Sequence, residues 1–254
     1  MTDGLYWLKR TKAFLRSKKK ERTGKMDTDK LYRVQKQDLP KLEDLLNHSF
    51  ANDPLYRTLI PNEAVRKRLM PELFHSDLDE FFETCQIFAD SPELKAVLVV
   101  EDEAHPRGFF RMMHASLRAL LMTDTSLIRE DPSLKTFENF LKGEDYLNSA
   151  WTQALHVRQR LHIIYLAVDP RAQHQGLADR LMETLVAYAE AHHMMLSLET
   201  HNERNLSFYH RYAFEVCEIV QKHFALKQYC LIRRPASGLL EEQTASGEAA
   251  GLLE

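Results

Sequence analysis

The turn Gln173-His174-Gln175-Gly176-Leu177-Ala178 has the clearest chemical potential in the chain. It follows an apolar, β-branched stretch that ends at Asp169-Pro170, and apolar residues at helical spacing come after it. A turn from a strand into a helix presents free backbone N–H groups at the helix N-terminus, where the helix dipole adds partial positive charge. Such groups bind phosphate, and the small residues Gly176 and Ala178 allow a ligand to approach the backbone closely.

The same turn lacks two common nucleotide-binding fingerprints. The G-x-G-x-x-G pattern of dinucleotide-binding folds is absent, and so is the Gly-Lys-Ser/Thr of phosphate-binding loops. ATP, GTP and dinucleotides are therefore disfavoured. Taken alone, the turn fits either a phosphate-bearing ligand or an ordinary strand-to-helix connection.

The surrounding residues favour the ligand. The spacing Gln173-x-x-Gly176-x-Ala178 resembles the acyl-CoA-binding motif Q/R-x-x-G-x-G/A of the GNAT superfamily of N-acyltransferases. Residues 166–170 are similar to the fourth strand of that superfamily and its exit. Leu198-Glu199-Thr200, followed by Asn205 and Phe208-Tyr209, resembles its fifth strand and the short helix beyond. In one departure, Ala213 stands where members commonly have glycine, which costs stability if the position needs a positive φ.

This resemblance implies an α/β (α+β) fold, in which helices flank a mixed sheet that splays between its fourth and fifth strands. Pantetheine would lie in that gap. The backbone of Leu166, Ala167 and Val168 would bind it, and one of these amides would polarise the thioester carbonyl. Asn205 would hydrogen-bond the pantetheine arm, and Tyr209 would protonate the departing thiolate as the catalytic acid. The amides of the turn would hold the pyrophosphate, namely those of Gln173, His174, Gln175, Gly176, Leu177 and Ala178.

The resemblance further implies an N-acyltransferase, most simply an N-acetyltransferase. It would move the acetyl group of acetyl-CoA to a small-molecule or peptide amine by direct attack in a ternary complex, without a metal. The alternative is a non-catalytic acyl-CoA-binding or regulatory module with the same fold. Tyr209 could instead be a core aromatic.

The general base stays open among Glu199, His162 and Tyr165. His162 and Tyr165 are three apart on a predicted strand, so we expect them on opposite faces.

Hydrophobic periodicity predicts the elements that would position these residues in one domain over residues 31–235. A strand at 31–34 and helices from Asp38 and over 62–84 come first. A hairpin of 96–100 with 109–113 follows, and then a helical insert, about 116–158, which could shape the acceptor site. The remaining elements are a strand over 161–168, a helix over 176–192, a strand over 194–199, a helix over 205–212 and strands over 214–220 and 224–232.

The two ends of the chain differ from this pattern. Residues 1–30 are strongly basic and read as a disordered leader, although residues 5–25 also suit contact with an anionic membrane surface. Residues 236–254 read as an acidic disordered tail.

Composition bounds the remaining possibilities. The net charge of −3 argues against a nucleic-acid binder, and no apolar run is long enough for a transmembrane helix. The cysteines, Cys85, Cys217 and Cys230, are odd in number and scattered, which suits a reducing compartment. We therefore expect a cytoplasmic protein, and leave a homodimer open.

Overall fold

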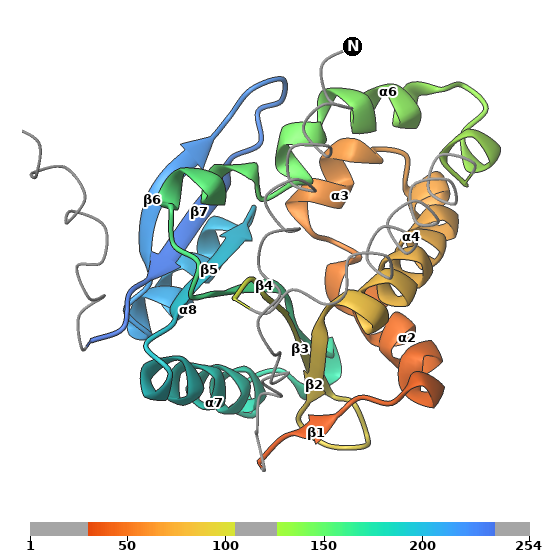
Figure 1. Ribbon diagram of the computed structural model, residues 1–254. Coiled ribbons are helices and arrows are strands. Elements are labelled where there is room, and N and C mark those ends of the chain that lie inside the picture. Colours follow the sequence, from red (N-terminus) through yellow and green to blue (C-terminus); the bar gives the residue numbers. More distant parts are fainter. Residues whose placement is uncertain (1–29, 105–125, 237–254) are drawn as a thin grey trace, which may run out of the picture.

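A seven-stranded mixed sheet organises the part of the chain that the computed structural model describes, residues 30–104 and 126–236 (Figure 1). The strand order is β1-β2-β3-β4-β5-β7-β6, and every neighbouring pair is antiparallel except β4 and β5. The strands are β1 Tyr32–Arg33, β2 Gln86–Ala89, β3 Ala96–Asp102, β4 Arg160–Val168, β5 Met195–Thr200, β6 Glu215–Val220 and β7 Gln228–Arg233.

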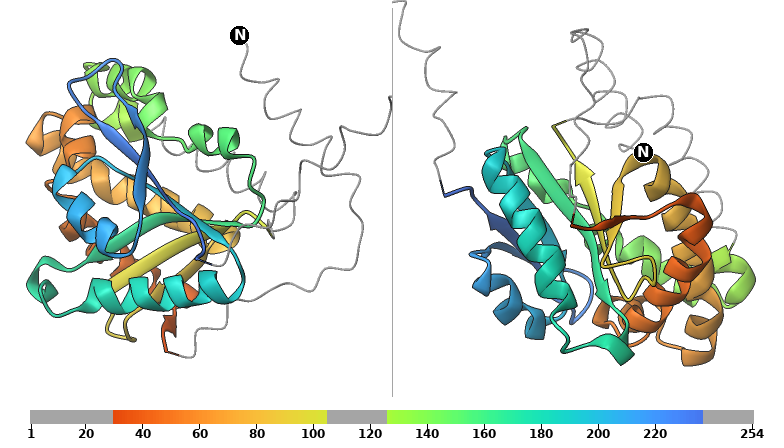
Figure 2. Two further views of the ribbon diagram at one scale, coloured as in Figure 1. Left: turned by 90° about the vertical axis from the view of Figure 1, so that its left-hand side faces the viewer. Right: turned by 90° about the horizontal axis from the view of Figure 1, so that it is seen from below.

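Helices cover both faces of this sheet (Figure 2). One face packs against α2 Leu39–Phe50, α3 Pro54–Leu59 and α4 Glu63–Thr84, and the other against α7 Leu177–Ala191 and α8 Leu206–Arg211. We call these the α4 face and the α7 face. The predicted helix 62–84 is confirmed. Its apolar stripe is buried, and Asn62 caps it by accepting from the N–H groups of Ala64 and Val65.

The predicted hairpin of 96–100 with 109–113 is wrong. β3 pairs with β2 along one edge and with β4 along the other, so neither edge is left for a further strand. Residues 109–113 lie outside the described residues. β2 was not predicted, because all four of its residues are buried and give no period-2 signal.

The insert between β3 and β4 is mostly helical where it is described. It includes α6 Lys135–Lys142 and the 3₁₀ turns η2 Glu144–Tyr146 and η3 Ala150–Leu155. Asn139 Nδ2 donates to the carbonyl of Leu59 in α3 at 3.1 Å, and Tyr146 Oη accepts from the N–H of Lys222 at 2.7 Å. The insert therefore joins the helices of the α4 face to the loop between β6 and β7 (Figure 1).

The predicted leader and tail lie outside the described residues, apart from Lys30 and Ala236. Within the described ranges, no helix is long and apolar enough to cross a membrane.

Candidate active site

β4 and β5 separate in the middle of the sheet. They pair in parallel from Arg160 opposite Met195 to Ile163 opposite Leu198, and the pairing stops there although β4 continues to Val168. β5 meanwhile continues to pair with β7 as far as Thr200. The predicted splay is therefore present. We call the edge of residues 164–168 that faces away from β3 the open edge, since no strand of the described part pairs with it.

The pairing of β4 with β3 decides which main-chain groups point to the open edge. Asp169 N donates to Lys95 O at 2.8 Å, so the N–H of Asp169 points toward the strand of β3. Antiparallel ladders alternate, and the N–H and C=O groups of Val168 and Leu166 therefore point away from β3. Those of Ala167 point toward it. The Val168 carbonyl accepts from Ser49 Oγ at 3.1 Å, which leaves the Val168 N–H and both Leu166 groups on the open edge.

The turn before α7 has the conformation that a close ligand approach requires. His174 and Gly176 both have positive φ, at 61° and 74°. A Cβ placed on Gly176 would meet no described atom within 4 Å, so there is open space above this backbone. Gly176 is the N-cap of α7 and supplies no side-chain cap, and the first bond of the helix runs from Arg180 N to Gly176 O. The N–H groups that precede it in the first turn therefore have no intrahelical acceptor.

The residues predicted along this turn are accessible, Gln173, His174 and Gln175 fully and Leu177 and Ala178 partly. Nearby arginines are already engaged. Arg171 pairs with Asp169 at 2.6 Å, and Arg180 donates to the carbonyl of Lys30 at 2.7 Å.

The helix α8 places Asn205 and Tyr209 beside the end of β5. Asn205 Nδ2 donates to Thr200 Oγ1 at 3.4 Å. Tyr209 is buried against Phe208 and Phe214, with ring centroids 5.3 and 5.8 Å away. Burial raises the pKa of its phenol, so Tyr209 stays protonated at neutral pH. Among the described residues none hydrogen-bonds this hydroxyl.

His162 and Tyr165 lie on the same face of β4, contrary to the prediction of opposite faces. His162 is opposite Glu101 and Tyr165 is opposite Val99, and those two β3 residues share a face. The cause is a β-bulge, which leaves Ile164 as an extra residue on β4 and reverses the alternation. Both side chains therefore point to the α4 face.

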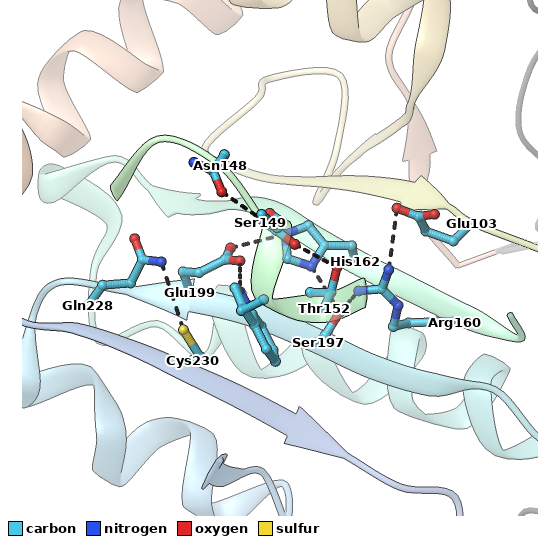
Figure 3. A network of polar contacts seen from close by, with 12 residues as sticks. Glu103, Asn148, Ser149, Thr152, Arg160, His162, Ser197, Glu199, Gln228 and Cys230 are labelled. Carbon is cyan, nitrogen blue, oxygen red and sulfur yellow. Dashed lines mark hydrogen bonds and ion pairs between the residues drawn. The ribbon is translucent and has the colours of Figure 1, made fainter. Parts of the chain in front are cut away.

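A buried polar network occupies the paired end of β4 on this face (Figure 3). Glu199 Oε2 pairs with His162 Nε2 at 3.0 Å, and its Oε1 accepts from Trp151 Nε1 of the insert. The other side of the imidazole, Nδ1, is 2.9 Å from Ser197 Oγ. The sequence leaves the general base open among Glu199, His162 and Tyr165, and it does not predict that the first two pair. The network comprises Glu103, Ser149, Trp151, Arg160, His162, Ser197 and Glu199.

The partners of Glu199 within the network favour its charged form. Burial alone would raise the pKa of Glu199, but the charge and hydrogen bond of His162 and the bonds from Trp151 and Ser149 lower it. Both carboxylate oxygens are thus occupied by groups of the chain itself. His201 follows β5 on the same face, where burial lowers its pKa to about 4, and its Nε2 is 3.0 Å from Gln228 Oε1.

A different pair lies beside the open edge. Tyr165 Oη donates to Asp77 Oδ2 of α4 at 2.6 Å and is 3.5 Å from Tyr56 Oη. Burial raises the pKa of Asp77 to about 6, although the Tyr165 hydrogen bond opposes it. Asp77 was not among the predicted residues. It lies four residues after Leu73 and three after Phe74, so a carboxylate on the apolar stripe of a helix was the signal that could have identified it.

Together these features are a gap between two splayed strands and, at the start of the helix that follows, a turn whose backbone N–H groups have no intrahelical acceptor. A family model described as acetyltransferase (GNAT) family matches residues 62–214. The chain therefore belongs to the GNAT family of acetyltransferases. No curated protein matches its sequence significantly.

The chain is similar to several solved structures, of which the first named here shares its fold. A histone acetyltransferase HPA2 and related acetyltransferase from Corynebacterium glutamicum is 18% identical, with a TM-score of 0.53 over 83% of this chain and 98% of that one. The ribosomal-protein-S18-alanine N-acetyltransferase of Escherichia coli is 13% identical, with a TM-score of 0.47 over 83% and 96%. The PaiA N-acetyltransferase of Thermoplasma acidophilum, solved with coenzyme A, is 11% identical, with a TM-score of 0.47 over 80% and 97%.

Proposed function

We propose that the protein is an N-acetyltransferase that transfers the acetyl group of acetyl-CoA to the amine of a small molecule or peptide. The observation that carries this proposal is the open edge of β4. There no strand of the described part of the chain pairs with the main-chain groups of Leu166 or with the N–H of Val168. Such groups are costly to leave unsatisfied inside a sheet, and an extended ligand with amide groups satisfies them in the manner of an added strand.

The residues present fit coenzyme A. Leu166 and Val168 would hold the pantetheine arm, and a main-chain N–H of this edge would polarise the thioester carbonyl. Ala167, whose polar groups face β3, would line the site through its side chain alone. The free N–H groups of the α7 first turn would bind the pyrophosphate, with the helix dipole adding to their attraction. The space above Gly176 gives phosphate oxygens room to approach.

Asn205 and Tyr209 would serve the reacting end. Asn205 would turn its amide to the pantetheine arm, and Tyr209 would donate its phenolic proton to the leaving thiolate. A raised pKa keeps the Tyr209 proton in place at neutral pH, while the thiolate formed by cleavage takes it up. The state of the three cysteines is consistent with direct attack by the amine, without a covalent enzyme intermediate. Cys85 is buried, and burial raises the pKa of Cys217 and takes that of Cys230 to about 12, so none is an activated nucleophile.

The test is a thermal-shift titration of the full chain with acetyl-CoA, with ATP and NAD as controls. A ligand at about 100 times its Kd adds about 2.7 kcal/mol to the free energy of unfolding. We expect stabilisation by acetyl-CoA alone, followed by release of free CoA thiol when an amine is added. Stabilisation without thiol release would instead support a non-catalytic acyl-CoA-binding module. A lack of stabilisation by acetyl-CoA would overturn the proposal.

The cytoplasm is the compartment that we propose, because Cys85, Cys217 and Cys230 form no disulfide in the described structure, which suits a reducing environment.

A further inference from the structure

The acceptor amine must lose a proton before it can attack the thioester, and none of the residues proposed above accepts that proton. An alkyl amine is largely protonated at neutral pH and has no lone pair to attack a thioester until it loses a proton. A base must therefore lie beside the open edge on the acceptor side. Glu199 and His162 are bound to each other and to the insert, and His201 is half-buried with its pKa lowered to about 4, which makes it a weak base.

Tyr165 is placed to meet this requirement. It directly precedes Leu166, so its Cα lies about 3.8 Å from that of a residue on the open edge. Its ring is fixed by Phe50, Phe74 and Phe81, with centroids 5.4, 6.0 and 5.8 Å away. Its hydroxyl is held at 2.6 Å from the Asp77 carboxylate, and both side chains remain partly accessible.

We propose that Tyr165 and Asp77 form a proton relay that deprotonates the acceptor amine. The proposal rests on the proposed N-acetyltransferase function. The ammonium N–H proton passes to Tyr165 Oη as the Tyr165 hydroxyl proton passes to Asp77 Oδ2. The amine nitrogen keeps the electron pair and is neutral, Tyr165 is again a phenol, and Asp77 is a neutral carboxylic acid that later returns its proton to solvent. Tyr165 is the group that touches the amine, and Asp77 acts through it.

The groups that face Asp77 suit this direction of transfer. They are Tyr165 from β4 and Glu80 from α4 itself, while Tyr56 of α3 and Asp53 before it lie behind Tyr165. None of these groups is a cation, so nothing among them neutralises the carboxylate. Burial raises the pKa of Asp77 to about 6, which leaves it ionised at pH 7 yet a stronger base than an exposed aspartate. The pKa of Tyr165 is raised well above its usual value, so it stays a phenol between turnovers.

The experiment measures kcat against pH for the full chain with acetyl-CoA and three probe amines: spermidine, a peptide with an N-terminal alanine and a lysine-containing peptide. We expect the wild-type kcat to fall as the pH drops through about 6, because Asp77 becomes protonated there. Asp77→Asn should lower kcat at pH 7 about 100-fold and remove this acidic limb, with acetyl-CoA stabilisation retained. Glu63→Gln is the matched control, a carboxylate-to-amide change at an exposed ion pair of the same helix.

Tyr165→Phe and the double variant separate a relay from a structural role. Tyr165→Phe keeps the ring and its packing, and we expect it to reproduce the loss of kcat and of the acidic limb. The double variant should be no slower than either single variant, because both remove one path. Asp77→Asn with the parental kcat and acidic limb would overturn the relay alone, as would additive losses in the double variant. Wild-type protein that releases no CoA with any of the three amines would overturn the proposed function, and the relay with it.

Discussion

The two ends of β4 place polar side chains on the same face of the sheet, but these side chains have different partners. At the paired end, Arg160 and His162 meet Ser197 and Glu199 of the neighbouring strand, and the insert adds Trp151. At the open edge, Tyr165 meets Asp77, and the strand beside it has moved away. In the first group, Glu199 and His162 bond to other side chains of the chain. In the second group, Tyr165 and Asp77 are partly accessible, and burial raises the pKa of the Asp77 carboxyl to about 6.

The difference shows that residue type alone does not identify a catalytic group. A histidine beside a glutamate looks more reactive than a tyrosine beside an aspartate, yet Glu199 and His162 already bond to each other and to Trp151, Ser149 and Ser197. A buried pair that is fully bonded stabilises the fold only while both partners remain, whereas an imperfectly satisfied one is a candidate for chemistry. Four predictions test this contrast.

The largest effect should come from the paired end. Glu199→Ala removes the carboxylate that pairs with the buried His162 and accepts from the Trp151 N–H, and breaking a buried pair destabilises proteins by about 3–5 kcal/mol. Denaturant unfolding should show this drop in the free energy of unfolding. Glu63→Ala, which removes only an exposed ion pair, should show little change. If Glu199→Ala kept its stability but lost turnover, the network would belong to the chemistry and the contrast would fail.

The second effect belongs to the reacting end. Tyr209→Phe should lower kcat about 100-fold, the size of a lost general acid, while stability stays near the parental value. The hydroxyl has no described hydrogen-bond partner to lose, and the ring contacts with Phe208 and Phe214 remain. Steady-state kinetics and thermal unfolding of the same preparation measure both. Parental turnover would remove Tyr209 from the mechanism and leave it as a core aromatic.

The third prediction concerns how much an ionised Asp77 lowers the free energy of unfolding. Its folded pKa of about 6 lies above the ordinary 3.8, so the folded protein binds this proton more tightly than the unfolded chain. The contribution of Asp77 to stability therefore decreases as the pH rises from about 4 to about 6 and stays lower above that window. Asparagine has no proton to lose. Asp77→Asn should be more stable than wild type by on the order of 2 kcal/mol at pH 7.5, and the difference should vanish near pH 4.

Denaturant unfolding at both pH values measures this difference. Asp53, whose pKa burial also raises to about 6, contributes equally to both proteins and cancels. A pH-independent difference would mean that Asp77 stays in one ionisation state throughout. A variant that is more stable at pH 7.5 but slower in turnover would show that the open edge sacrifices stability for function.

The local elements around the site could be predicted from the sequence. The apolar run of β4, the turn before α7, the stripe of α7 and the short helix α8 all follow from near-neighbour spacing. The open edge also followed from the resemblance of the turn and of the segment around Asn205 to a known family. The acceptor side did not, because its contacts join distant segments. Tyr165 and Asp77 are 88 residues apart, and Trp151 and Glu199 are 48 apart.

The bulge at Ile164 explains why the prediction for His162 and Tyr165 was wrong. Strict alternation is the only pattern that a strand's sequence offers, and one extra residue reverses every assignment beyond it. Whether β4 holds such a residue depends on its register with β3, which no local pattern in Ile163-Ile164-Tyr165 reveals. The sequence therefore identified the strand but not which residues share its face.

The prediction with the smallest expected effect concerns backbone strain at Ala213, in the turn after the helix α8 that carries Tyr209. Ala213, which follows α8, has φ at 59°, so the position where the family commonly has glycine does require the left-handed region. Ala213→Gly should relieve this strain and stabilise the protein by about 1 kcal/mol, raising Tm by about 2–4 °C. Ala187→Gly, on the exposed side of α7, is the matched control and should destabilise by a similar amount, because there glycine only adds unfolded-state freedom. If both substitutions destabilised the protein, the turn after α8 would be unstrained. The stability cost of the proposed site would then come from Asp77 alone.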